Sequence, residues 1–173
     1  TTSIIGNGVA LDIPVFCKEI QTVVEQGAPM PKILVSNRAQ IVMPYHVLFD
    51  QYEEERLGKK SFGSTKSGIA PFYSDKYAKI GFQVSELFDD ERLLEKVESV
   101  VEKKNILLEH MYHKPLLKVD ELMETLREYR DMIAPYVADT SVVLHNAMKE
   151  DKVILLEGQL GTLKDPDHGI YPM

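Results

Sequence analysis

The sequence predicts a helix-rich α/β fold, and three observations support this prediction. Short apolar segments alternate with helical patterns over the first 60 residues. Two long amphipathic patterns follow in the middle of the chain. Near the end, the apolar run Val153–Leu156 leads directly into a polar loop bounded by glycines. A strand followed at once by such a loop is typical of open α/β sheets, in which ligands bind beyond the carboxyl ends of the strands.

Residues 1–60 are predicted to form alternating strands and helices. Ser3–Ile5 and Ile33–Val35 are short apolar segments of strand character. A helix is expected over 12–27, because Asp12 offers an N-cap, a proline lies in the first turn, and apolar residues recur at helical spacing. A second helix is expected over 44–58, opened by a proline and closed by a glycine.

Residues 61–74 carry no periodic pattern and are predicted to form a loop that binds the phosphate of a nucleotide. Its centre, Gly63–Gly68, holds three hydroxyl residues, one lysine and two glycines. Backbone N–H groups and hydroxyls in such a loop can cradle a phosphate. The glycine and lysine spacing of a Walker A loop is absent from the chain. Composition alone leaves a mobile surface loop as the alternative.

Residues 75–151 are predicted to form a helical subdomain. Apolar residues recur at helical spacing over 89–113 and again over 119–137, and a shorter helix is expected over 140–149. The two long helices are expected to lie antiparallel, joined near Pro115.

Residues 152–173 are predicted to contain a buried strand, Val153–Leu156, and a ligand-side loop. Within that loop, Asp165, Asp167 and His168 are residue types that ligate divalent metals. Adjacent residues in a turn bounded by proline and glycine rarely all face one centre. We therefore expect a hydrogen-bonded turn here and no metal site.

Several other titratable side chains are predicted to lie on helices and to take no part in catalysis or metal binding. His46 has no paired cysteine or second histidine at ligand spacing, so we expect a surface or half-buried position. Asp50 and the acidic run Glu53–Glu55 are expected to form a solvated helix face. Cys17 lies near the apolar face of its helix and is expected to pack in the core.

Composition narrows the class of protein. The 173 residues include 20 Lys and Arg against 27 Asp and Glu, a net charge of −7, which argues against a nucleic-acid partner. No run approaches the roughly 20 apolar residues that span a bilayer, so no membrane partner is expected. A single cysteine and the lack of a secretory segment favour a cytoplasmic protein. The character of both termini leads us to expect a piece of a longer chain.

Several segments together resemble the adenylosuccinate synthetase family, in the order and at spacing compatible with that family, over essentially the whole chain. These segments are Gly6–Val9, Ser36–Arg38, Pro44–His46, Gly63–Thr65, Gly68–Ile69 with Pro71, Tyr73 with Asp75–Lys76, Glu157–Gly158, Gly161–Leu163, Asp165, Asp167–Gly169 and Tyr171–Pro172. The resemblance implies the central segment of a larger, mostly parallel α/β nucleotide-binding fold.

The resemblance also implies a reaction. Such enzymes are homodimeric ligases of purine (AMP) biosynthesis that use GTP and magnesium (Mg2+) to phosphorylate the 6-oxygen of IMP. L-Aspartate then displaces the phosphoryl group. The family's phosphate loop and its catalytic Asp and His lie nearer the N-terminus than the segment resembled here. The resemblance therefore implies no catalytic residue and no metal ligand in this chain, GTP and magnesium sites mostly outside it, and no activity for the chain alone.

The resemblance assigns binding roles to particular residues. Thr65 matches a threonine that contacts the IMP phosphate, and Ser64 stands where a second threonine is usual. Lys79 stands where the family has an arginine that reaches into the partner subunit's nucleotide site. Lysine keeps the charge but lacks the bidentate fork of arginine. Ser67 and Gln83 also stand at positions that are usually arginine.

The last loop departs from the family pattern by one residue. Leu160 stands where a glutamine usually faces IMP, and Gln159 is the expected functional amide, with a purely structural role as its alternative. Two other functions stay open at this point: a synthetase acting on another purine monophosphate, and a non-catalytic nucleotide-binding or dimerisation module.

Overall fold

The computed structural model describes residues 1–60, 64–158, 161–165 and 167–170. The chain divides into two compact units, Thr1–Ser141 and Val142–Met173. Helix α6 (Thr140–Lys149) crosses the boundary between them.

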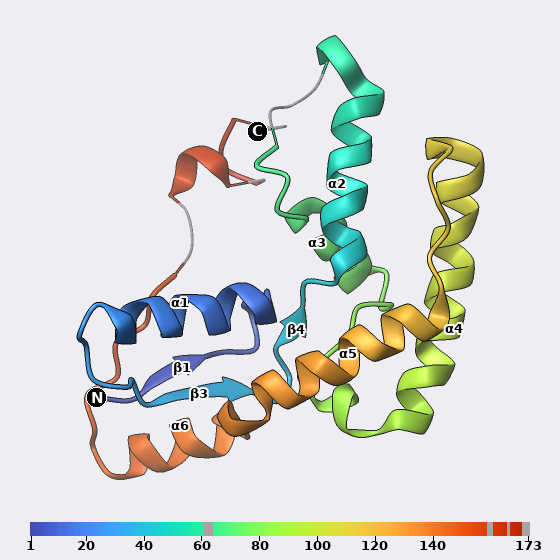
Figure 1. The fold of residues 1–173 in the computed structure, drawn as a ribbon. Coiled ribbons are helices and arrows are strands. Elements are labelled where there is room, and N and C mark those ends of the chain that lie inside the picture. The colour runs from blue at the N-terminus through green and yellow to red at the C-terminus, as the bar shows by residue number, and fades with distance from the viewer. Residues whose placement is uncertain (61–63, 159–160, 166, 171–173) are drawn as a thin grey trace. The chain divides into compact units, whose positions relative to one another are not determined.

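The first unit contains two small parallel sheets. In the larger sheet β3 is central, paired with β1 on one side and β5 on the other (Figure 1). The strands are β1 (Ser3–Ile5), β2 (Ala10–Leu11), β3 (Ile33–Ser36), β4 (Gln40–Ile41) and β5 (Val137–Ala138), with β2 and β4 forming the second sheet. The two strands predicted in the first 60 residues are confirmed, as is the helix-rich α/β fold.

Helices make up most of the first unit. They are α1 (Ile13–Glu25), α2 (Pro44–Leu57), α3 (Ile69–Tyr77), α4 (Asp90–Leu107) and α5 (Val119–Ile133). Short 3-10 turns cover Gly58–Lys60, Val84–Phe88 and Ala134–Tyr136, and a π-helical turn, Leu108–Tyr112, continues α4.

Helix α1 begins where the sequence predicted. Asp12 Oδ1 accepts a hydrogen bond from the Val15 N–H at 3.0 Å, which satisfies one of the free donors at the helix start. The buried face of α1 carries Phe16 and Ile20, and the Phe16 ring meets Tyr136 edge-on at 5.2 Å between centroids. This face packs α1 against α5.

Helix α2 has the predicted bounds, but its buried face differs from the prediction. The N-terminal turn is closed by His46, whose Nδ1 accepts the Met43 N–H at 2.9 Å. His46 is fully buried and Asp50 is only 7 % exposed, so the predictions of an ordinary histidine and a solvated aspartate are both wrong. Both side chains hydrogen-bond with α3 or with the residue that precedes it.

The predicted loop is shorter than expected, because α3 begins at Ile69 and residues 69–74 are helical. Gly68 takes a left-handed conformation, φ +78°, and ends the loop. Pro71 lies in the first turn of α3, where a helix does not need its N–H. Gly68 and Pro71 therefore mark the start of a helix, whereas their residue types had led to the prediction that the loop continues to residue 74.

The two long helices form as predicted, but they are not an antiparallel pair. The connection after α4 runs back along it, since the Asn105 side chain exchanges two hydrogen bonds with the Leu117 backbone. Helix α5 then crosses α4 (Figure 1) and is joined to its start by ion pairs of Asp90 with Arg127 and Arg130.

The second unit corrects another prediction. Val153–Leu156 does not form a strand, and Val153, Leu155 and Leu156 are 100 %, 92 % and 86 % exposed. A strand needs a neighbouring backbone to complete its hydrogen bonds. No segment within the described ranges pairs with this one. The predicted turn at Asp165 is confirmed, because its Oδ1 accepts the Asp167 and His168 N–H groups at 2.9 Å each.

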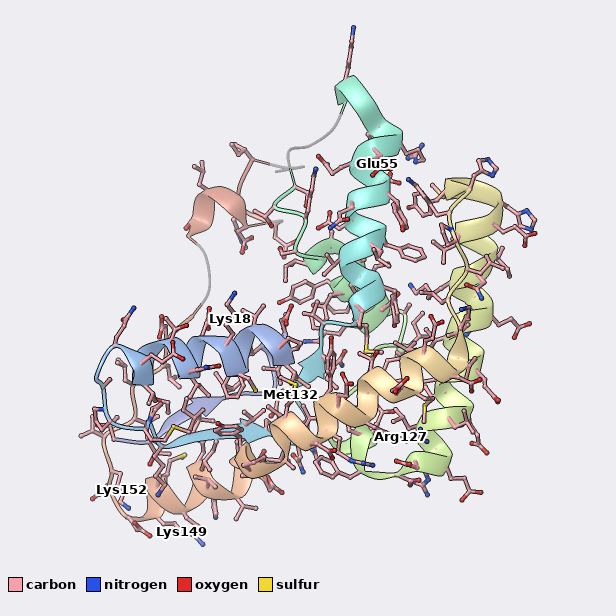
Figure 2. All side chains as sticks on the ribbon, in the orientation of Figure 1. Lys18, Glu55, Arg127, Met132, Lys149 and Lys152 are labelled. Atoms are coloured by element: carbon pink, nitrogen blue, oxygen red, sulfur yellow. The ribbon has the colours of Figure 1, made fainter. Side chains whose placement is uncertain are left out.

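One apolar core lies within the first unit. It draws side chains from α1, β3, β4, α2, α4 and α5 and from the segment between α3 and the turn Val84–Phe88. Among them are Ile13, Val35, Ile41, Tyr45, Phe82, Val97, Leu126 and Ile133. Charged side chains such as Lys18 on α1, Glu55 on α2 and Arg127 on α5 project from the outer faces (Figure 2). Against this pattern, a few titratable groups on α2, α3 and α4 are buried beside the core, and one of them, Asp75, directly follows the predicted phosphate loop in the chain.

Candidate functional site

The predicted phosphate loop presents hydroxyl groups and one cation in front of α3. Ser64 Oγ accepts the Lys66 N–H at 3.0 Å, and Thr65 Oγ1 lies 2.7 Å from Ser67 Oγ. Ser64 is partly exposed, and the residues Thr65–Ser67 are exposed. The two internal hydrogen bonds hold the loop in a tight turn. Because Thr65–Ser67 are exposed, the hydroxyls and the ammonium group of the loop can be reached by an anion.

The loop ends at Gly68, which is pressed against α2. A Cβ at this position would lie 2.7 Å from Val47 N and 2.8 Å from the His46 carbonyl carbon. The Gly68 N–H donates to Asp50 Oδ2 at 2.9 Å. Only glycine combines the positive φ with so close an approach to another backbone. The end of the loop is therefore fixed on the surface of α2.

Three buried polar side chains join α2, α3 and α4. Asp75 of α3 is 2 % exposed, and its two carboxylate oxygens face different partners. His46 Nε2 of α2 lies 2.9 Å from Oδ2, and Lys104 Nζ of α4 lies 2.5 Å from Oδ1. Because His46 Nδ1 accepts the Met43 N–H, the imidazole carries its proton on Nε2 and donates it to Asp75.

The surroundings of this buried network determine its charges. Burial lowers the pKa of His46, and the hydrogen bond to Asp75 opposes this effect without cancelling it. Burial alone would raise the pKa of Asp75, but the hydrogen bonds from His46 and Lys104 outweigh it and lower that pKa. The network therefore holds a neutral imidazole, a carboxylate and an ammonium group. Its burial makes it a brace among three helices and keeps it out of contact with a substrate.

Tyr45 lies beside the same network. Burial and the nearby Asp75 carboxylate raise the pKa of Tyr45 well above its usual value. Its hydroxyl has no hydrogen-bond partner among the described residues. The Lys104 ammonium lies 5.4 Å from the centroid of the Tyr45 ring and 5.2 Å from that of Phe49. These rings shield the ammonium from water and add a favourable cation–π contact.

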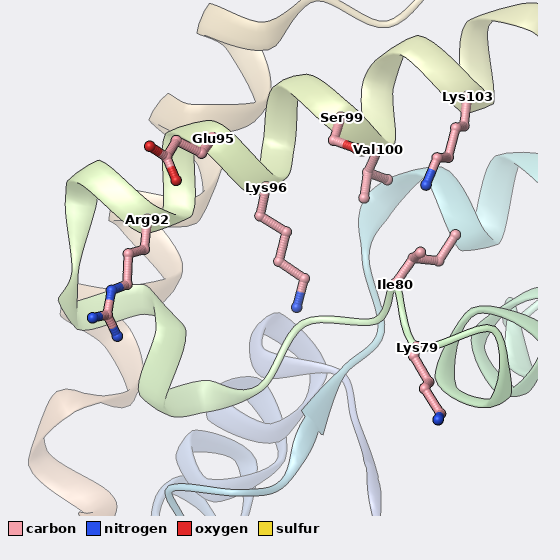
Figure 3. Close-up of a pocket in the computed structure, with 8 residues that line it drawn as sticks. All are labelled: Lys79, Ile80, Arg92, Glu95, Lys96, Ser99, Val100 and Lys103. Atoms are coloured by element: carbon pink, nitrogen blue, oxygen red, sulfur yellow. The ribbon is translucent and has the colours of Figure 1, made fainter.

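Lys79 lies away from the loop. It follows the C-terminal end of α3, is exposed, and has a positive φ of 61°. The nine residues of α3, about 13 Å of helix, lie between the loop and Lys79. Lys79 and Ile80 line an open groove with side chains of α4 (Figure 3). The other lining residues are Arg92, Glu95, Lys96, Ser99, Val100 and Lys103.

Within this groove, Lys96 is already engaged. Its Nζ donates to the Gly81 carbonyl oxygen at 2.7 Å and to Glu86 Oε1 at 2.6 Å, and it lies 4.9 Å from the Phe82 ring centroid. Lys96 therefore stabilises the segment after α3, which carries Lys79.

Two of the segments that carry the family resemblance, Gly6–Val9 and Ser36–Arg38, meet at the carboxyl edge of the larger sheet. The Ser36 hydroxyl, at the end of β3, donates to Asn7 Oδ1 at 2.5 Å, just beyond β1. The Arg38 N–H in turn donates to Ser36 Oγ at 3.1 Å. The carboxyl edge of a parallel sheet is the usual place for ligands in this class of fold.

Comparison with known proteins decides the family. The sequence profile of the family "Adenylosuccinate synthetase" matches residues 1–173. The chain belongs to the adenylosuccinate synthetase family. It is 43 % identical to the adenylosuccinate synthetase of Streptomyces coelicolor over 171 residues, which cover 99 % of this chain and 40 % of that protein. The adenylosuccinate synthetase of Bacillus subtilis is 40 % identical, with the same coverage.

The fold agrees with the family. A solved structure of fully ligated adenylosuccinate synthetase from Plasmodium falciparum superimposes with a TM-score of 0.81 at 24 % identity, covering 98 % of this chain and 39 % of that one. The chain thus spans about 40 % of the length of the synthetases it matches. The family resemblance of the sequence is confirmed.

The structure brings together some of the predicted site residues. Ser64 and Thr65 share one loop, whereas Lys79 lies at the far end of α3. Gln159 and Leu160 fall outside the described residues. The described residues contain no group of three His, Cys, Asp or Glu side chains placed to hold a metal ion. No helix in the described part of the chain is long and apolar enough to span a bilayer.

Sequence reasoning missed the residues that hold the loop in place. Asp50 was predicted to lie on a solvated helix face and His46 at a surface or half-buried position. Lys104, in a short basic run near acidic residues, was predicted to lie on the solvated surface. The sequence did contain an indication that His46 and Asp50 are buried. The two residues are four apart, on one side of the helix, and close to Phe49, which places them beside an apolar helix face. Lys104 carried no local signal, since its partner Asp75 is 29 residues away.

Proposed function

We propose that the protein to which this chain belongs is a GTP-dependent ligase that joins L-aspartate to IMP to form adenylosuccinate, in purine nucleotide (AMP) biosynthesis. The observation that carries this proposal is the loop Ser64–Ser67, which presents hydroxyls and a cation and is fixed on α2, in a chain of this family. As such an enzyme it would act in the cytoplasm.

The reaction proposed proceeds by activation of a poor leaving group. The purine N1 gives up its proton to a base of the full-length protein outside this chain, and the 6-oxygen of IMP attacks the γ-phosphorus of GTP. The bond from that phosphorus to the β–γ bridging oxygen breaks, releasing GDP. The amino group of L-aspartate then attacks C6, loses a proton, and expels the oxygen as inorganic phosphate. Catalysis of such steps depends on positioning and on stabilising the transferred charge.

In this chain we assign Ser64 and Thr65 to binding the 5′-phosphate of IMP. Their hydroxyls donate hydrogen bonds to phosphate oxygens, and the Lys66 ammonium adds a positive charge. The phosphate would replace the Thr65–Ser67 contact seen here, because a hydroxyl has one proton to donate. Fixing the phosphate orients the purine ring for reaction at its 6-position.

We assign Lys79 to the nucleotide site of a partner subunit in a homodimer. The separation of Lys79 from the loop by the length of α3, and its exposed position, support a role outside its own site. We also assign Gln159 to the purine base. Neither residue carries a reacting atom in this proposal.

The chain supplies binding surfaces rather than catalytic groups in this proposal. The described residues hold no group of three His, Cys, Asp or Glu side chains that would ligate magnesium, and we derive no step through the ion from this chain. GTP and magnesium would be held mostly by parts of the full-length protein outside the chain. We therefore expect residues 1–173 alone to be inactive.

Turnover by the full-length protein tests the proposal. Adenylosuccinate is expected only when IMP, GTP, magnesium and aspartate are all present. Thr65→Val should raise KM for IMP about tenfold, the value of one charge-assisted hydrogen bond, and leave KM for GTP unchanged. Ser85→Ala, an exposed hydroxyl on the 3-10 turn before α4, is the matched control and should change neither constant.

The failures are also informative. No product with IMP, but product with another purine monophosphate, would overturn the assignment of the substrate. No turnover with any purine monophosphate would overturn the assignment as an enzyme and leave a nucleotide-binding or dimerisation module.

A further inference from the structure

We propose that Asp50 is a positioning residue for the phosphate loop, acting in two opposed ways. Its hydrogen bond to Gly68 anchors the loop, and its negative charge limits how strongly the loop binds an anion. This inference rests on the proposed function, because it takes the IMP phosphate as the ligand of the loop.

The anchoring follows from the contact between Asp50 and Gly68. The Asp50 side chain is on α2, buried to 7 % exposure, and its Oδ2 accepts the Gly68 N–H at 2.9 Å. Gly68 is the residue between the loop and α3. A buried N–H left without an acceptor is costly, so this bond defines where the loop ends.

Close packing reinforces the anchor. The Gly68 backbone lies so near the backbone of His46 and Val47 that there is no room for a side chain. Asp50 lies one helical turn beyond His46, on the same side of α2. Together, the packing and the hydrogen bond allow only one placement of Gly68. A small displacement of this residue would move the hydroxyls that precede it by a similar amount.

The charge effect follows from distance along the chain. Thr65 is three residues before Gly68, so their Cα atoms are at most about 11 Å apart. The Asp50 carboxylate, which contacts the Gly68 N–H, therefore lies on the order of 10 Å from a phosphate bound at Thr65. This separation is comparable to the Debye length of about 8–10 Å, so the carboxylate repels that phosphate through partial screening. The same carboxylate also faces the start of α3, where backbone N–H groups would otherwise favour an anion.

Two substitutions separate the effects. Asp50→Asn keeps an oxygen that can accept the Gly68 N–H but removes the charge. Asp50→Ala removes both. Glu55→Gln is the matched control, because it removes one negative charge from an exposed position of the same helix, where Glu55 forms a surface ion pair with Lys114, a residue far from Gly68 in the chain. Asp50→Ser, whose hydroxyl is too short to reach the same N–H, replaces Asp50→Ala if that variant does not fold.

The full-length protein is assayed for kcat and for KM of IMP and GTP, and hydrogen exchange is followed in peptides covering residues 64–70. Asp50→Ala is expected to raise KM for IMP about tenfold and to speed exchange in this segment, without a change in KM for GTP. Asp50→Asn is expected to keep exchange slow and to lower KM for IMP about two- to threefold, from the lost repulsion. Glu55→Gln should change neither.

Each alternative has a distinct result. Equal KM for IMP in Asp50→Ala and Asp50→Asn would overturn the role of the hydrogen bond, and a raised KM in Asp50→Asn would overturn the charge effect. A loss of thermal stability with unchanged KM would show a purely structural role and overturn the proposal. If the wild-type protein does not bind or convert IMP, the proposed function fails, and the anchor is then decided by exchange alone. Unchanged exchange in Asp50→Ala would overturn it.

Discussion

Removing Lys104 should destabilise the protein more than removing any exposed lysine. Lys104 is 7 % exposed and donates to Asp75, which is 2 % exposed. In Lys104→Met, the side chain keeps its apolar length but loses the ammonium group. The Asp75 carboxylate is then left in the core with only the hydrogen bond from the neutral His46.

The size of the effect can be estimated from the distance between the charges. At 2.5 Å from Nζ to Oδ1, an effective dielectric constant of about 20 gives an attraction of about 7 kcal/mol. The cost of taking both charges out of water offsets a large part of this. Breaking a buried pair by removing one partner costs about 3–5 kcal/mol in other proteins. Because His46 remains to compensate Asp75, we expect a value near the lower limit, about 3 kcal/mol.

Urea unfolding of the full-length protein, followed by circular dichroism, measures this loss in the free energy of unfolding. Lys103→Met is the matched control, since Lys103 is the exposed neighbour on α4, and it should cost less than about 0.5 kcal/mol. The double variant Lys104→Met/Asp75→Asn should cost no more than Lys104→Met alone, because it leaves no unpaired buried charge. Additive losses in the double variant would refute the coupling, and a loss below about 1 kcal/mol in Lys104→Met would refute the estimate.

Three further predictions concern pH, the loop and the first helix. Because the pKa of His46 is lowered in the native state, the unfolded chain takes up a proton that the native chain does not. The free energy of unfolding should therefore fall as the pH drops below about 6.5. Unfolding curves measured between pH 7 and 5 give this dependence of the free energy on pH. It should be weaker in His46→Gln and unchanged in His110→Gln, a substitution at an exposed site. Gly68→Ala should cost at least about 2 kcal/mol, against about 1 kcal/mol for Gly58→Ala, which has positive φ but open space; equal losses in urea would contradict the role of the close packing. Asp12→Ala should cost about 1 kcal/mol through the lost cap of α1, and an unchanged unfolding midpoint would contradict it.

Local sequence patterns predicted most of the elements correctly. The start of α1 follows from the Asp12 cap and the adjacent proline, and the end of α2 follows from Gly58. These features depend on contacts within one turn of the chain, so the residues concerned are neighbours in the sequence. The segment Gly68–Pro71 was misinterpreted because glycine and proline mark both loops and the first turn of a helix.

Structural features that depend on residues far apart in the sequence were predicted less well. Val153–Leu156 has the composition of a buried strand but is exposed, because burial of a strand requires a neighbouring segment and not only apolar residues. The crossing of α4 by α5 was likewise not predictable from two amphipathic patterns. It depends on the connection running back along α4, which the hydrogen bonds between Asn105 and Leu117 maintain.

The sequence by itself determined the helix-rich α/β class and the family. It also predicted the loop residues Ser64 and Thr65 as the place for a phosphate, and this assignment stays a proposal. All three follow from residue types in a fixed order along the chain. Only the tertiary structure showed that Asp50 holds the end of this loop and that His46, Asp75 and Lys104 brace the helices around it. The reason is physical: a buried charge is stable only beside its partner, and the partners here lie 18 to 29 residues apart.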